Sequence, residues 1–159
     1  MLFFSPQTYR CMLADAVQTF PDECCGFLFG VETDKGERFL TDLLIVNNAK
    51  EGDKRRRFEI ASKDYLRAER YADEHDLTLL GIYHSHPNHP AVPSEHDRLA
   101  AQPFFSYVIV SVLDGRADAV RSWRLNDERY FEEEPICLRQ TVPLHAENRL
   151  SLHFMKKEL

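Results

Sequence analysis

The feature that most constrains this chain is a pair of histidines placed directly after a short apolar run. The run extends from Leu77 to Tyr83, and His84 and His86 follow it in the string His-Ser-His-Pro. A short apolar run of this kind predicts a buried strand. Because alternate residues of a strand point to the same face, both imidazoles can reach one metal ion while Ser85 points away.

A third candidate ligand follows in a proline-rich segment. Three prolines, at positions 87, 90 and 93, exclude regular structure after the strand. Ser94 and Asp97 then have the S-x-x-D spacing of a capping box, so a helix is expected to begin there. Two histidines and the Asp97 carboxylate would leave the fourth position of a tetrahedral zinc open to water, as in catalytic sites.

Length and charge narrow the class of protein. A chain of 159 residues is expected to form one domain. The net charge of −6 and the lack of a long apolar segment indicate binding to neither nucleic acid nor a membrane. The first residues lack the basic and apolar regions of a signal peptide, so we expect a cytoplasmic protein. A homo-oligomer is compatible with these features.

The four cysteines do not form a recognisable metal or disulfide pattern. Cys11, Cys24, Cys25 and Cys137 include no C-x-x-C pair, and the adjacent Cys24 and Cys25 should face opposite sides of a strand. We therefore expect buried, reduced thiols rather than a disulfide framework or a cysteine zinc site.

Hydrophobic periodicity predicts an α/β protein with a mixed central sheet flanked by helices, not a doubly wound one. Helices are expected over 5–20, 62–75 and 94–102, and strands over 24–31, 38–47, 58–61, 77–84, 105–113, 117–125 and 130–142. The domain is expected to comprise residues 1–142. Residues 143–159 are expected to be a C-terminal tail, whose mixture of charged and apolar residues favours neither a helix nor a strand.

A metal ion with an open position needs a general base, and Glu23 is the best candidate in the sequence. It stands at the start of the predicted strand over 24–31, where a carboxylate could exchange protons with a metal-bound water. Taken alone, Glu23 would be interpreted as a solvated acid before a strand.

Together these residues resemble the signature of the JAMM/MPN-domain metalloproteases, E…H-[S/T]-H-P-x6-S-x-x-D. Glu23, His84, His86, Ser94 and Asp97 fill every position, and the segment 21–30 is similar to the family's P-x-E-x-C-G-x-L-x-G. The resemblance covers residues 5 to about 135. It implies an MPN-like (cytidine-deaminase-like) fold and one zinc per chain, bound by His84, His86 and Asp97. It also implies Glu23 as general acid and base, and Ser94 as stabiliser of the tetrahedral intermediate.

The small chain looks like the free-standing prokaryotic members of that family. This resemblance implies a zinc metallopeptidase or isopeptidase that hydrolyses the amide bond after the Gly-Gly end of a ubiquitin-like or sulfur-carrier protein. Which carrier it cuts, and which group leaves, stay open at this point.

Several alternatives remain. The string from His84 to His89 resembles the H-x-H-x-D-H of metallo-β-lactamases, with Asn88 in place of aspartate. The chain could also be a non-catalytic MPN scaffold, although the complete ligand set argues against this. It could hold a structural zinc instead, although the lack of a fourth protein donor argues against that. The run Lys54–Arg57 is interpreted as a solvated loop in preference to a docking patch for an acidic partner. His89 is expected to be solvated, and His96 has no assigned role.

Overall fold

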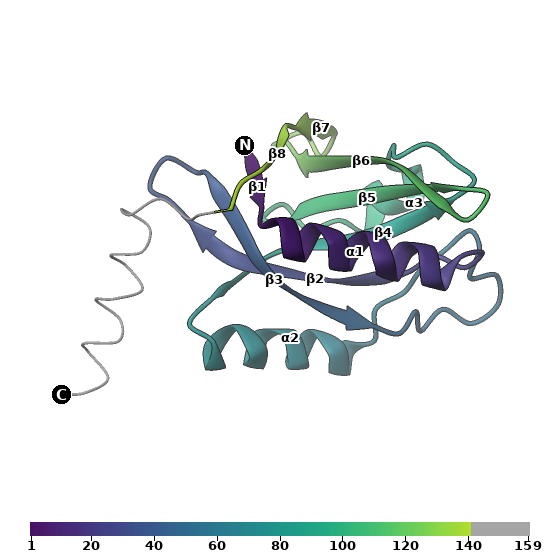
Figure 1. Ribbon diagram of the computed structural model, residues 1–159, viewed down its shortest axis with the longest axis horizontal. Helices are drawn as coiled ribbons and strands as arrows, with labels where there is room; N and C mark the ends of the chain where they lie inside the picture. Colours follow the sequence, from purple (N-terminus) through teal and green to yellow (C-terminus); the bar gives the residue numbers. More distant parts are fainter. Residues whose placement is uncertain (141–159) are drawn as a thin grey trace.

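The computed structural model describes residues 1–140, which form an eight-stranded mixed sheet and three helices (Figure 1). The strand order is β7-β6-β5-β4-β2-β3-β1-β8. The strands are β1 (Leu2–Phe4), β2 (Cys25–Glu32), β3 (Arg38–Val46), β4 (Thr78–Pro87), β5 (Ser106–Leu113), β6 (Arg116–Leu125), β7 (Phe131–Glu134) and β8 (Ile136–Leu138). The helices are α1 (Pro6–Thr19), α2 (Ser62–Glu74) and α3 (Glu95–Ala100). The predicted tail lies outside the described residues.

Helices cover both faces of the sheet (Figure 1). Met12 and Ala16 of α1 pack into one core cluster, whereas Ala68 and Ala72 of α2 and Ala101 after α3 pack into another. The two faces follow from the alternation of side chains along each strand. On β4, Tyr83 belongs to the α1 side and Ile82 belongs to the α2 side. Leu80 also lies on the α1 side, because the β2–β4 pairing shifts register between Leu28 and Phe29 and interrupts the alternation there.

Strand β4 occupies the middle of the sheet and is buried from Leu80 to Pro87. It pairs antiparallel with β2, where Cys25 lies opposite His84, and parallel with β5, where Ile109 lies opposite His84. A Cβ on Gly81 would lie 2.5 Å from the Ser106 carbonyl oxygen, so glycine permits the close approach of β4 and β5. The end of β4 is therefore held on both sides.

The predicted fold class is confirmed, and the three helices and the main strands lie where they were expected. Three details of the prediction were wrong. Strand β1 was not expected, and residues 58–61 form no strand. Of the segment 130–142, where one strand was predicted, the described part up to residue 140 holds two short strands at opposite edges of the sheet. The division falls at Pro135, which has no N–H to donate to a ladder but accepts a hydrogen bond from Leu2.

Burial was predicted correctly for two of the four cysteines. Cys24 and Cys25 are buried in different core clusters, so they face opposite sides of the sheet. All four cysteines are free, although Cys11 and Cys137 are exposed rather than buried. Within residues 1–140, none of the helices combines the length and the apolar composition that crossing a membrane requires.

Candidate metal centre

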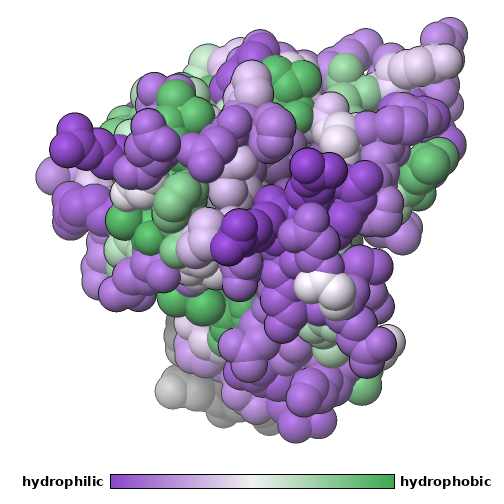
Figure 2. All heavy atoms as spheres, turned by 90° about the vertical axis from the view of Figure 1, so that its right-hand side faces the viewer, coloured by the Kyte–Doolittle hydropathy of each residue, from purple (hydrophilic) through white to green (hydrophobic). Residues whose placement is uncertain are grey.

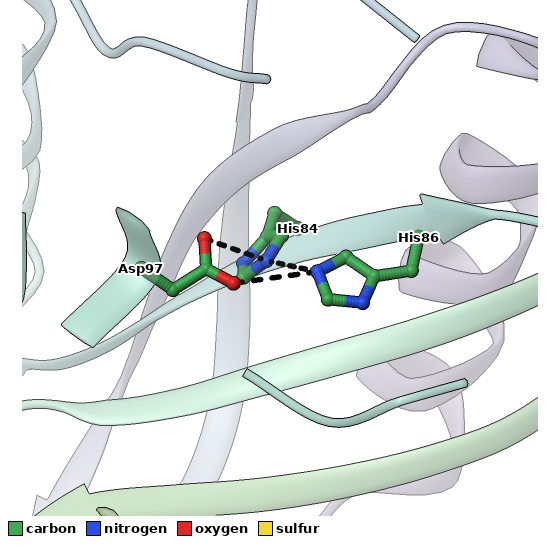
Figure 3. Close-up of side chains that lie close together, drawn as sticks. All are labelled: His84, His86 and Asp97. Carbon is green, nitrogen blue, oxygen red and sulfur yellow. Dashed lines mark hydrogen bonds and ion pairs between the residues drawn. The ribbon is translucent and has the colours of Figure 1, made fainter. Parts of the chain in front are cut away.

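The three predicted ligands converge at the end of β4 (Figure 3). The Nε2 atoms of His84 and His86 lie 3.0 Å apart. Oδ1 of Asp97 is 3.5 Å from Nε2 of His84, and Oδ2 is 3.4 Å from Nε2 of His86. Two nitrogen donors and a carboxylate therefore point at one another from a strand and from a helix.

The protein fixes the ring of His86 through a backbone contact. Its Nδ1 lies 2.8 Å from the carbonyl oxygen of Pro90, which can only accept a hydrogen bond. The proton of a neutral ring is therefore on Nδ1, and Nε2 keeps a lone pair directed at the other two ligands.

The ring of His84 is packed against an aromatic side chain. Its ring stacks on Phe58, with ring centroids 4.4 Å apart and planes at 22°. Its Nδ1 is the one buried side-chain nitrogen or oxygen in the described part of the chain that has no hydrogen-bond partner. Complete burial lowers the pKa of His84, which favours the neutral ring that a metal needs. Two imidazoles and one carboxylate form a donor set that suits a divalent ion such as zinc.

Asp97 is oriented by the capping box that its spacing predicted. The Ser94 amide donates to Oδ2 of Asp97 over 2.7 Å, and the Asp97 amide donates to the Ser94 hydroxyl over 3.1 Å. Burial raises the pKa of Asp97, but the two neighbouring imidazoles and the hydrogen bond from the Ser94 amide outweigh burial and hold the pKa well below its usual range. The carboxylate is thus ionised and aimed at the histidines.

Glu23 lies beside this group and is buried, with 5% of its surface exposed. The interpretation of Glu23 as a solvated acid is therefore wrong. Its amide donates to the Lys54 carbonyl over 2.7 Å, and its carbonyl accepts from the Asn48 side chain over 3.1 Å. Burial raises the pKa of Glu23 to about 8; nearby Asp97 also raises it, while His86 and Arg57 lower it. A carboxyl with this pKa can gain and lose a proton near neutral pH.

Two cavities flank the three predicted metal ligands. The first, of about 280 Å³, contains His84 and Asp97 and has apolar walls that include Phe58, Ile60 and Tyr65. The second, of about 540 Å³, contains Glu23, His86 and Ser94 and is lined by Arg55, Arg56, Arg57, His89, Pro90 and Val92. Figure 2 shows this end of the molecule, where hydrophilic side chains surround apolar ones.

The sequence analysis did not predict some of the residues that line the cavity around His84. Phe58 was expected in a strand, yet it lies in a loop and stacks on His84. The available signal was an aromatic residue directly after the basic run, which a solvated loop alone does not require. His96 lines the apolar cavity, and His75 is exposed.

Two alternative interpretations of the histidines fail in the structure. His89 is exposed and is not among the converging ligands, so the string from His84 to His89 does not act as a metallo-β-lactamase motif. A structural zinc site would need a fourth protein ligand, and the group has three members among the residues that the structure describes.

The fold and this group of side chains define a candidate metallohydrolase site in a mixed α/β sheet. Residues 5–126 match the family of prokaryotic homologues of the JAB domain, and the chain belongs to that family. It is 36% identical over 124 residues to a CysO-cysteine peptidase of Mycobacterium tuberculosis, covering 77% of this chain and 81% of the relative. It is 27% identical over 134 residues to a desampylase of Pyrococcus furiosus, covering 84% and 88%.

Solved structures agree with this assignment. A protein of Desulfitobacterium hafniense superposes with a TM-score of 0.78 at 28% identity, covering 92% of this chain and 98% of that one. A protein of Salinibacter ruber superposes with a TM-score of 0.67 at 37% identity, covering 89% of this chain and 94% of that one. A JAB1/MPN-domain protein of Archaeoglobus fulgidus gives 0.56 at 18% identity, with 87% and 98% covered, and supports the fold alone. The predicted MPN-like fold is confirmed.

Proposed function

We propose that this protein is a zinc-dependent peptidase that hydrolyses the amide bond after the Gly-Gly end of a ubiquitin-like or sulfur-carrier protein. The observation that carries the proposal is the convergence of His84, His86 and Asp97 beside a buried Glu23. The family and the names of two relatives, a CysO-cysteine peptidase and a desampylase, support the same chemistry and the same class of substrate.

In this proposal His84, His86 and Asp97 hold the zinc ion. Zinc bound there supplies a water whose pKa falls to about 7, which makes a nucleophile available at neutral pH. The other steps belong to side chains of this chain.

Glu23 is the proposed general base and acid. It accepts a proton as the oxygen of water bonds to the carbonyl carbon, and it gives that proton to the amine nitrogen as the C–N bond breaks. Burial raises the pKa of Glu23 in the metal-free protein, and a cation bound beside it would lower the pKa toward the range that a general base needs at neutral pH.

Ser94 is the proposed stabiliser of the charged oxygen. Its hydroxyl oxygen accepts the Asp97 amide, and the hydroxyl hydrogen remains able to donate to an oxyanion in the cavity that Ser94 shares with Glu23. A hydrogen bond of this type, set in place before the reaction, stabilises the transition state without reorganisation.

The test is a carrier that ends in Gly-Gly with one residue appended, incubated with the zinc-loaded protein and followed by mass spectrometry. We expect loss of the appended residue, abolition by a chelator and recovery with zinc. Replacing Gly-Gly by Ala-Ala should slow cleavage, because side chains would crowd the approach to the metal ligands. Zinc-loaded protein that cuts neither a carrier nor isopeptide-linked ubiquitin would instead indicate a non-catalytic scaffold.

A further inference from the structure

The loop that carries the basic run Lys54–Arg57 is hydrogen-bonded to Glu23. The Lys54 carbonyl accepts the Glu23 amide over 2.7 Å. The Asn48 side-chain amide donates to the Glu23 carbonyl over 3.1 Å and to the Arg57 carbonyl over 3.0 Å. Residues 54–57 are exposed, as expected of a solvated loop, and these backbone hydrogen bonds hold the loop beside Glu23, the residue proposed for proton transfer.

The side chains of this run form one wall of the larger cavity. Arg55, Arg56 and Arg57 line it together with Glu23 and Ser94. Their charge is only weakly compensated, because the ion pair found for these guanidinium groups within residues 1–140 is an exposed one of 3.9 Å between Arg56 and Asp53. Arg57 is close enough to Glu23 to lower its pKa. The cavity therefore offers guanidinium groups to an anion.

The position of Glu23 shows which part of the substrate would enter this cavity. The proton donor must be next to the nitrogen that leaves. Glu23 lines the basic cavity and is absent from the walls of the apolar one, which holds His84 and Asp97. The leaving group therefore extends into the basic cavity, and the Gly-Gly tail approaches from the other side.

We infer that the arginines of the basic cavity bind the free α-carboxylate of a short leaving group, an amino acid or a small peptide. This inference rests on the proposed function. A guanidinium group matches a carboxylate in charge and in shape, and a volume of about 540 Å³ is in the range of small-ligand sites, about 300–1,000 Å³. A leaving group joined through the side chain of an internal lysine would place no carboxylate there.

The test compares two substrates that differ in one group. One is a carrier ending in Gly-Gly followed by a single residue with a free carboxylate, and the other carries the same residue as a carboxamide. We expect kcat/KM to be about tenfold or more higher for the carboxylate, the size of a charge-assisted hydrogen bond. In the triple variant Arg55→Gln, Arg56→Gln, Arg57→Gln this ratio should fall toward one.

Arg70→Gln is the matched control, since Arg70 is exposed on α2 and lines neither cavity. The Arg70→Gln variant should cleave both substrates at the wild-type rates, so the ratio of kcat/KM between carboxylate and carboxamide should also be unchanged. Because Arg57 also acts on Glu23, the rate for both substrates can change together in the triple variant, and only the ratio reports carboxylate binding.

The remaining outcomes are distinct. Cleavage of both substrates at equal rates by the wild-type protein would overturn the inference and leave the proposed function standing. An equal loss on both substrates in the triple variant, with the ratio kept, would mean that the arginines bind the body of the carrier, and would also overturn it. Cleavage of neither substrate by the zinc-loaded wild-type protein would overturn the proposed function, and the inference with it.

Discussion

The Ser85 hydroxyl accepts a hydrogen bond from the Cys24 amide over 2.8 Å, and the Ser85 amide donates to the Cys24 carbonyl over 3.2 Å. Cys24 directly follows Glu23, and Ser85 stands between the two histidines. The serine therefore joins the strand of the metal ligands to the segment of the glutamate, on the face of the sheet opposite the ligands.

Replacing this serine should weaken the protein and displace Glu23. Ser85→Ala leaves the buried Cys24 amide without its acceptor, which costs about 1–3 kcal/mol in the free energy of unfolding. Ser85→Thr keeps the hydroxyl and should lose less. Denaturant unfolding of the two variants is the measurement, and an Ala variant as stable as the wild type would show that the hydrogen bond contributes nothing.

Metal content tests the ligand set. Purified protein should bind about one zinc per chain, as a three-ligand catalytic site does. His84→Ala should lose it, because one of three donors is gone, whereas His89→Ala should retain it, because His89 is outside the group. Elemental analysis measures both, and equal zinc in the two variants would contradict the site.

Glu23→Gln separates proton transfer from metal binding. The amide cannot accept a proton from water, so activity on a Gly-Gly carrier should fall about 10²–10⁴-fold, the usual contribution of a general acid or base. Zinc content should stay that of the wild type. A fully active variant would assign the proton transfer to another residue.

The same variant should change the pH dependence of stability in the metal-free protein. The pKa of Glu23 is raised from 4.5 to about 8 on folding, so between these pH values the folded state holds a proton that the unfolded state has released. The free energy of unfolding from this group therefore falls as pH rises through that window. Glu23→Gln has no proton to lose in this window, so its free energy of unfolding should not decrease in this way. Relative to the wild type, the variant should be more stable by a few kcal/mol at pH 8 and by little at pH 4.

Urea unfolding of the metal-free proteins at several pH values provides the comparison. Glu59→Gln serves as the matched control, because it makes the same chemical change at an exposed position. Parallel profiles for wild type and Glu23→Gln would mean that folding does not raise the pKa of Glu23.

The convergence of His84, His86 and Asp97 could be predicted because most of its geometry is local. His84 and His86 share a face through strand periodicity, and the S-x-x-D spacing places Asp97 in the first turn of a helix. The contact between the strand and the helix is long-range. It was predicted from the resemblance to the JAMM/MPN signature.

Other features depend on contacts that no short segment contains. β1 has three residues and gains its stability from β3 and β8, which follow much later in the chain. Phe58 is placed by the ring of His84 rather than by a strand. The predicted strand over 130–142 divides because Pro135 ends one pairing and Leu2 begins another, a choice made by the N-terminus and not by local propensity.

Helix α3 has six residues, too few to persist through its own hydrogen bonds. The Asp97 oxygen that accepts the Ser94 amide also faces His86, so any local opening of α3 would remove a ligand. An ion bound at the centre would then oppose that opening by mass action, in proportion to its concentration over its dissociation constant. The rates of amide hydrogen exchange at Ser94 and Asp97 would therefore report how much of the protein holds an ion, and they can be measured without any substrate.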